Sequence, residues 1–232
     1  MAAFSPRFTI LLPTPSPSPS SPLSASATLQ QLADWDCGLA CVSMVLTALN
    51  IPRSSPAELH GICPLQNIWT VDLAYILRRF GVEDFTYYTS YIGVNWQYLS
   101  KSFYRDSITE DQSRVHALFA GAADRNVRIV PMILDMNDIR RFLISGKYAV
   151  IILVNLSVLN CGTCTKKGYE KISGDDFVGH YILLAGYEPD SDTILYRDPG
   201  TNEVLCAVDA DDLDVARSSL GTDHDAIVVR VA

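Results

Sequence analysis

Apolar residues in the first two thirds of the chain recur mostly with the spacing of α-helices. Between Cys37 and about Leu49 they surround the helix almost completely, so we expect this helix to be central and buried, with Asp36 as its N-cap. A second helix is predicted from Val71 to Phe80. Thr70 is its expected N-cap and Gly81 its C′ residue. Three further helices are predicted, of which the last has the best pattern: Asn95 to Tyr104, Asp111 to Ala120, and Asp138 to Ile144.

Beyond these helices the spacing of apolar residues changes to that of β-strands. Five strands are predicted: Tyr148 to Val154, Tyr181 to Tyr187, Thr193 to Arg197, Glu203 to Val208, and Ala226 to Val231. Helices that come first and strands that follow indicate an α+β fold rather than an alternating βαβ one. We therefore expect N-terminal helices packed on an antiparallel sheet.

Residues 1–27 differ in composition from the rest of the chain. They hold six of the twelve prolines and seven serines, no acidic residue, and a single basic one, Arg7. A Pro-Ser alternation forms neither a helix nor a sheet interior, so we predict a disordered tail followed by one domain over residues 28–232. The alternative is a plastid transit peptide, which is also rich in serine and poor in acids. If residues 1–27 are a disordered tail, we expect a cytoplasmic protein. If they are a transit peptide, we expect a plastid protein.

Composition and charge narrow the classes of function. The chain has 232 residues, of which 48% are hydrophobic and 19% charged, as is typical of a globular domain. A net charge of −8 argues against nucleic acid as a partner. No apolar run reaches the roughly 18 residues that span a bilayer, so no membrane partner is expected. Six cysteines in a long chain without a clear signal peptide indicate reduced thiols.

The candidate chemistry begins at Cys37, the first residue of the predicted central helix. A helix N-terminus stabilises the thiolate, which is the nucleophilic form of cysteine. Gly38 permits the close approach of another chain segment or a substrate, and Cys41 lies one turn further in, on the buried side. Gln31 precedes Cys37 by six residues, where its side-chain amide can help the Cys37 N–H to hold an oxyanion.

A thiolate nucleophile needs a base from elsewhere in the chain. Of the four histidines, His180 is the best candidate because it begins an apolar strand. Asp198 ends the next strand, and antiparallel pairing would bring its carboxylate to the imidazole, where it fixes tautomer and orientation. Each residue also has a structural interpretation: a buried helix cysteine, a strand histidine and an Asp-Pro-Gly turn. The order Gln, Cys, His, Asp favours a papain-like thiol hydrolase.

Other polar clusters offer metal or redox chemistry. Cys161 and Cys164 form a single CxxC pair, which indicates a plain loop, a redox pair, or a zinc site that needs Cys63 or a histidine to complete it. Thiol hydrolysis itself requires no metal. Three acidic pairs are candidate metal ligands, although such pairs are usually solvated: Asp175-Asp176, Asp211-Asp212, and Asp223 with Asp225.

The motifs around the candidate residues resemble those of the C39 group of papain-like cysteine peptidases. The shared pattern is Gln-x4-Asp-Cys-Gly-x-Ala-Cys, followed by Gly-His-Tyr and then Asp-Pro. The resemblance implies that Cys37 is the nucleophile and His180 the base. It also implies that Asp198 orients the histidine and that Gln31 is the oxyanion-hole residue.

From about Gln31 to the C-terminus, the chain resembles more closely the plant guanylyl cyclase 1 family and the animal guanylyl-cyclase-domain-containing proteins. The motifs that carry this resemblance are Asp34-Trp-Asp-Cys-Gly-Leu-Ala-Cys41, Trp69-Thr-Val-Asp-Leu-Ala74, Tyr91-Ile-Gly-Val-Asn95, the Cys161/Cys164 pair, and Ala216-Arg-Ser-x-x-Gly-Thr-Asp-x-Asp225. The family name implies conversion of GTP to cyclic GMP, with Mg²⁺ or Mn²⁺ as cofactor. The Pro/Ser-rich start departs from the family's usual N-terminus, and the chain has no Gly-x4-Gly-Lys-Ser/Thr phosphate loop.

Three hypotheses about function follow from the sequence. The residues favour a thiol hydrolase that acts on a peptide or other amide bond. The family name favours a guanylyl cyclase that acts on GTP. The third hypothesis is a non-catalytic binding protein on a peptidase-like scaffold, and the intact Cys-His-Asp set counts against it.

Overall fold

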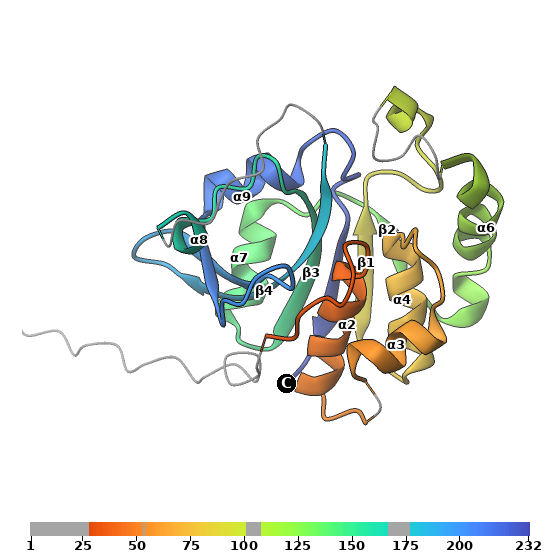
Figure 1. The fold of residues 1–232 in the computed structure, drawn as a ribbon, viewed down its shortest axis with the longest axis horizontal. Helices are drawn as coiled ribbons and strands as arrows, with labels where there is room; N and C mark the ends of the chain where they lie inside the picture. Colours follow the sequence, from red (N-terminus) through yellow and green to blue (C-terminus); the bar gives the residue numbers. More distant parts are fainter. Residues whose placement is uncertain (1–27, 53, 101–107, 167–176) are drawn as a thin grey trace, which may run out of the picture.

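The structure is a computed structural model that describes residues 28–52, 54–100, 108–166 and 177–232 (Figure 1). The predicted N-terminal tail, the pair Asp175-Asp176 and the end of the helix predicted from Asn95 lie outside these residues. Within the described ranges, no helix is both long enough and apolar enough to cross a membrane.

A seven-stranded sheet with the strand order β2-β1-β7-β3-β4-β5-β6 forms the centre of the fold. Its strands are β1 (Phe85–Thr89), β2 (Ile129–Pro131), β3 (Tyr148–Asn155), β4 (Gly179–Glu188), β5 (Thr193–Arg197), β6 (Cys206–Asp209) and β7 (Ala226–Arg230). The pair β1–β2 is parallel, and the other neighbouring pairs are antiparallel. The expected α+β architecture is therefore confirmed, with one parallel pair at an edge.

Helices cover both faces of the sheet (Figure 1). They are α2 (Cys37–Ala48), α3 (Pro56–Ile62), α4 (Thr70–Arg79), α6 (Ile108–Ala120), α7 (Met136–Ile144), α8 (Gly162–Lys166) and α9 (Ala210–Arg217), with 3-10 turns η1 (Trp96–Ser100) and η2 (Ala123–Arg125). Ile151 of β3 packs in the core that holds α2 and α4, and its neighbour Ile152 packs with α7 and α9. Burial on both faces explains why this strand is a continuous apolar run in the sequence.

The prediction that helices come first and strands follow is correct for the C-terminal strands. It missed β1 and β2. These two strands lie between helices in the sequence and form one edge of the sheet. The strand β1 (Phe-Thr-Tyr-Tyr-Thr) contains no aliphatic residue, and the three residues of β2 are too few to give a clear alternation. The helices α3, α8 and α9 were also not predicted, and the strand predicted from Glu203 begins only at Cys206. In the described part of the helix predicted from Asn95, the structure has the turn η1.

Three helix starts differ from the prediction. One is that of α6, which begins at Ile108 rather than at Asp111. Thr70 is the first residue of α4 rather than its N-cap, and the Trp69 N–H donates to Asp72 Oδ2 at 2.9 Å. The helix α7 begins at Met136, where Asp135 caps it by accepting the Asp138 N–H at 2.8 Å. In α7 the Asp138 carboxylate accepts the Asp135 N–H in return, so this start is a capping box.

Candidate active site

A tight turn before α2 presents Cys37. The carboxylate of Asp36 is fully buried and accepts the Leu32 N–H at 3.0 Å and the Ala33 N–H at 3.1 Å. It also contacts His60 Nε2, and the His60 ring stacks on Trp35 with centroids 4.8 Å apart. Asp36 is the N-cap residue of α2, as predicted, but its side chain makes no cap hydrogen bond and faces the preceding turn instead. This carboxylate therefore shapes the turn and not the helix end.

Cys37 is the first residue of α2 and is 6% exposed. Its Sγ accepts the Tyr181 N–H at 3.4 Å, so the thiol lies directly against β4. Cys41, one turn further along α2, is completely buried, and burial raises the pKa of its thiol well above the usual range. At Gly38 a Cβ atom would lie 2.9 Å from Leu73 Cδ1 and 3.0 Å from Tyr181 Cδ2. The close approach at Gly38 therefore brings α2 against α4 and β4.

His180 lies on β4, and Asp198 directly follows the neighbouring strand β5. The two residues are 6% and 5% exposed. His180 Nε2 is 2.7 Å from Asp198 Oδ1. Burial lowers the pKa of His180, but the charge of Cys37 and hydrogen bonds to Asp198 and Cys37 outweigh burial and raise it to about 10. Burial acts upward on the pKa of Asp198, and the hydrogen bond and charge of His180 bring it below its usual value. The structure thus brings together the thiol, imidazole and carboxylate that the sequence singled out.

The turn after β5 encloses this pair. The Gly200 N–H donates to Asp198 Oδ1 at 2.8 Å, and a Cβ at Gly200 would lie 3.5 Å from His180 Cε1. Gln31 joins the turn through its backbone N–H, which donates to Pro199 O at 3.0 Å. Its side-chain Nε2 donates to Ala33 O at 3.1 Å, and a second N–H remains on that nitrogen. The oxyanion role of Gln31 stays a prediction.

A cavity of about 170 Å³ opens beside Cys37, and we call it the Cys37 cavity. Its walls come from the segments 66–70 and 221–225, together with Asp34, Trp35 and Tyr181. Asp223 and Asp225 both line it, so one predicted acidic pair lies at the candidate site. Asp212 instead accepts Asn160 Nδ2 at 3.0 Å at the start of α9.

The two aspartates of the cavity are in different environments. Asp223 Oδ1 accepts the Tyr98 hydroxyl and, at 3.1 Å, Asn95 Nδ2, while burial raises the pKa of Asp223. Burial, followed by the charge of Asp223, raises the pKa of Asp225 to about 8. Hydroxyl groups of Thr70, Thr89 and Tyr87 hydrogen-bond the Asp225 carboxyl, while its Oδ1 atom is buried without a partner among the described residues. Asp225 is therefore a buried carboxyl in the wall of the cavity.

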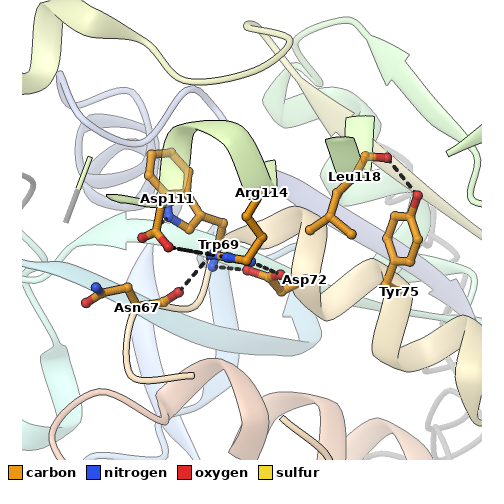
Figure 2. A network of polar contacts seen from close by, with 7 residues as sticks. All are labelled: Asn67, Trp69, Asp72, Tyr75, Asp111, Arg114 and Leu118. Atoms are coloured by element: carbon orange, nitrogen blue, oxygen red, sulfur yellow. Dashed lines mark hydrogen bonds and ion pairs between the residues drawn. The ribbon is translucent and has the colours of Figure 1, made fainter. Parts of the chain in front are cut away.

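Arg114 of α6 holds the wall of the cavity in place (Figure 2). Its guanidinium binds Asp72 and, at 2.9 Å, Asp111 Oδ1, and it donates to Asn67 O at 3.3 Å. Trp69 Nε1 donates to Asp111 Oδ2 at 2.9 Å. Figure 2 shows these groups joining α4, α6 and the segment before α4 into one network. Neither Arg114 nor His60 was singled out from the sequence, because Asp72 lies 42 residues from Arg114 and Asp36 lies 24 residues from His60.

This fold is that of the C39-like peptidases. A solved structure described as a C39-like peptidase from Bacillus anthracis matches 89% of this chain and 95% of its own, with a TM-score of 0.52 and 12% sequence identity. A family described as guanylylate cyclase matches residues 27–229. Guanylyl cyclase 1 from Arabidopsis thaliana is 37% identical over 210 residues, which are 88% of this chain and 74% of that protein. The chain belongs to the guanylylate cyclase family.

Proposed function

We propose that this protein is a thiol hydrolase that cleaves an amide bond, with Cys37 as nucleophile, His180 as general base and acid, and Asp198 as the residue that orients the imidazole. The observation that carries the proposal is the position of His180 between the helix-terminal thiol and a buried carboxylate. Asp198 binds His180 Nε2 at 2.7 Å, which leaves Nδ1 for the hydrogen bond to Cys37. Nucleophile, base and orienting group in this arrangement are what covalent hydrolysis by cysteine requires.

In the first half-reaction, the Cys37 thiolate attacks the carbonyl carbon of the amide, and the C=O electron pair moves onto oxygen. The Cys37 N–H and the second N–H of Gln31 Nε2 are the proposed donors to this oxyanion. As the oxyanion collapses, the C–N bond breaks and His180 gives its proton to the leaving nitrogen. A thioester remains on Cys37.

In the second half-reaction, His180 takes a proton from water while the water oxygen attacks the thioester carbon. The C–S bond breaks, the carboxylic acid leaves, and the thiolate and imidazolium that began the first half-reaction are restored. Asp198 keeps the imidazole in one orientation through both half-reactions. No step requires a metal.

The charge of the Cys37 cavity favours a cationic group on the substrate. Among the described residues that line it are three acidic side chains, Asp34, Asp223 and Asp225, and no Lys or Arg. An ammonium or guanidinium group would pair with the acidic wall and would favour the charged form of Asp225, which is protonated near pH 7 without such a partner. We infer a peptide or other amide that carries a basic group near the bond to be cleaved.

Guanylyl cyclase is the second candidate function, favoured by the family and by the two aspartates of the cavity. Cyclisation of GTP would need Mg²⁺ or Mn²⁺ on such carboxylates and cations along the triphosphate. No Lys or Arg is among the described residues that line the cavity, and Asp223 Oδ1 already accepts two hydrogen bonds. The cavity therefore favours a cationic amide over GTP. A third candidate is a binding protein that performs neither reaction.

Labelling with an electrophilic thiol probe, alongside an assay for cyclic GMP, tests the proposal. Peptide mapping should find the probe on Cys37, and Cys37→Ala should abolish labelling. The matched control is Cys63→Ala, which removes another buried thiol of the same core and should label like the wild type. Labelling of a different cysteine while Cys37 stays unmodified would contradict the proposal. Cyclic GMP that forms with Mn²⁺, disappears with a chelator and survives Cys37→Ala would establish a cyclase independent of this thiol.

A further inference from the structure

Three cysteines form a cluster on the face of the sheet opposite Cys37, which we call the three-thiol cluster. Cys161 precedes α8, Cys164 lies within it, and Cys206 begins β6. Their sulfur atoms all lie within 4.8 Å of one another, and Cys164 Sγ is 3.5 Å from Cys206 Sγ. The expectation that Cys63 or a histidine completes the CxxC pair is wrong, because the third thiol is Cys206 and Cys63 packs in the other core.

Backbone contacts hold the three thiols together. The Cys164 N–H donates to Cys161 Sγ at 3.2 Å. The Ala207 N–H, next to Cys206, donates to Thr163 Oγ1 at 3.1 Å. The CxxC turn is therefore tied to the strand that supplies the third sulfur, so the cluster is assembled by the fold itself.

The spacing of the sulfur atoms fits a single zinc ion. Thiolates bind Zn²⁺ at about 2.3 Å, so two of them on a tetrahedral ion lie about 3.8 Å apart. The 3.5 Å between Cys164 Sγ and Cys206 Sγ is close to this value. Because all three sulfur atoms lie within 4.8 Å of one another, only small side-chain movements would bring them onto one ion. Thiolates select soft ions such as Zn²⁺ over Mg²⁺ or Ca²⁺.

Tyr196 provides an independent observation. It lies opposite Cys206 in the β5–β6 pairing, so the two side chains share one face of the sheet. Tyr196 is fully buried, and its hydroxyl interacts with the Cys161 thiol. A buried hydroxyl needs a good acceptor, and a thiolate accepts a hydrogen bond more strongly than a thiol does. Conversion of Cys161 to a metal-bound thiolate would therefore improve the pairing of this hydroxyl.

We propose that Cys161, Cys164 and Cys206 bind one Zn²⁺ as thiolates, with an external ligand such as water in the fourth position. Binding releases the thiol protons to solvent and involves no electron transfer. The ion would join the segment after β3 to β6. Because the cluster faces the core of α7 and α9, the proposal does not depend on the chemistry at Cys37.

Zinc titration of the full chain under reducing conditions tests the site. A Cys37→Ala background removes the thiolate of the candidate active site as a competing ligand. We expect one Zn²⁺ per chain by elemental analysis and native mass spectrometry. Co²⁺ in its place should give thiolate-to-cobalt charge-transfer absorption and the intense visible bands of a tetrahedral site. Cys206→Ser should weaken zinc binding by at least about 100-fold, because loss of even an outer-shell partner costs about 10- to 100-fold.

Cys63→Ser, which alters a buried thiol outside the cluster, is the control and should bind zinc like its parent. Equal zinc affinity in the parent and Cys206→Ser would overturn the proposal. So would zinc-free protein in which peptide mapping finds a disulfide between two of the three cysteines. Circular dichroism establishes that each variant is folded, and Cys164→Ser replaces Cys206→Ser if the latter does not fold.

Discussion

At the scale of single residues, His180 and Asp198 each depend on the other for their charge. Both are at most 6% exposed, and an unpaired charge at such burial is unfavourable by several kcal/mol. Against the effect of burial, the charge of Cys37 and the hydrogen bond to Asp198 raise the pKa of His180 to about 10, and the hydrogen bond and charge of His180 lower that of Asp198. A change in either residue should therefore alter the behaviour of the whole unit.

Gly38→Ala tests how closely α2 must approach its neighbours. We expect a loss of about 1–3 kcal/mol in the free energy of unfolding, because the added methyl would lie 2.9 Å from Leu73 and 3.0 Å from Tyr181. The matched control is Gly61→Ala in α3, where a Cβ meets nothing within 4 Å and the change should be neutral or stabilising by about 0.5–1 kcal/mol. Urea unfolding measures both. Equal stability of the two variants would contradict the packing described for Gly38.

At the scale of elements, the candidate site depends on three segments that converge on the start of α2. The Asp36 turn presents the thiol, the turn after β5 encloses His180 and Asp198, and the segment before α4 forms a wall of the Cys37 cavity. The last of these is held by Arg114, which binds two carboxylates and a backbone carbonyl. The shape of the cavity should therefore depend on α6, although none of the described residues that line the cavity belongs to α6.

Arg114→Met should lower the free energy of unfolding by about 2–4 kcal/mol, because it leaves Asp72 and Asp111 largely buried without their cation. The lower half of this range is favoured since the Arg114 side chain is 27% exposed. Arg141→Met removes an exposed ion pair with Asp138 and should change stability by less than about 0.5 kcal/mol. Chemical denaturation compares the two variants. A similar small effect in both would show that the Arg114 network does not support the wall.

At the scale of the whole molecule, local patterns predicted the long elements and failed where distant segments meet. The apolar α2 and the strands β3, β4, β5 and β7 were predicted because each has a run of aliphatic residues. The strand β1 was missed because it contains no aliphatic residue, and β2 because it has three residues; the pairing of both is set by tertiary contacts. Cys37, His180 and Asp198 were identified from type and order, whereas Arg114 binds a carboxylate 42 residues away and Cys206 completes the three-thiol cluster from a strand with no motif of its own.

The stability of the whole molecule should depend on pH through Asp225. Its pKa of about 8 in the folded chain lies above the value of about 3.9 in the unfolded chain, so the folded state binds the proton more tightly. This contribution to stability is present in full below about pH 4 and is lost as pH rises through about 8. The melting temperature of Asp225→Asn should therefore fall less between pH 5 and pH 8 than that of the wild type.

Thermal unfolding at a series of pH values in this range measures the effect. Asp84→Asn, at a side chain that is 70% exposed, serves as the control and should follow the wild-type curve. If Asp225→Asn loses stability with pH as steeply as the wild type, Asp225 is not a protonated buried acid.

The most direct test of the central claim is the rate of Cys37 alkylation by iodoacetamide near pH 7, followed by peptide mass spectrometry in the wild type, Asp198→Asn and His180→Ala. If the three residues form one unit, Asp198→Asn should slow the reaction by about tenfold or more. His180→Ala should slow it further, because loss of one neighbouring opposite charge changes an ionisation equilibrium by about 10- to 1,000-fold. Asp190→Asn, at an exposed position in the turn between β4 and β5, should react like the wild type. Coincident rates in all four proteins would contradict the claim and favour a non-catalytic protein on this fold.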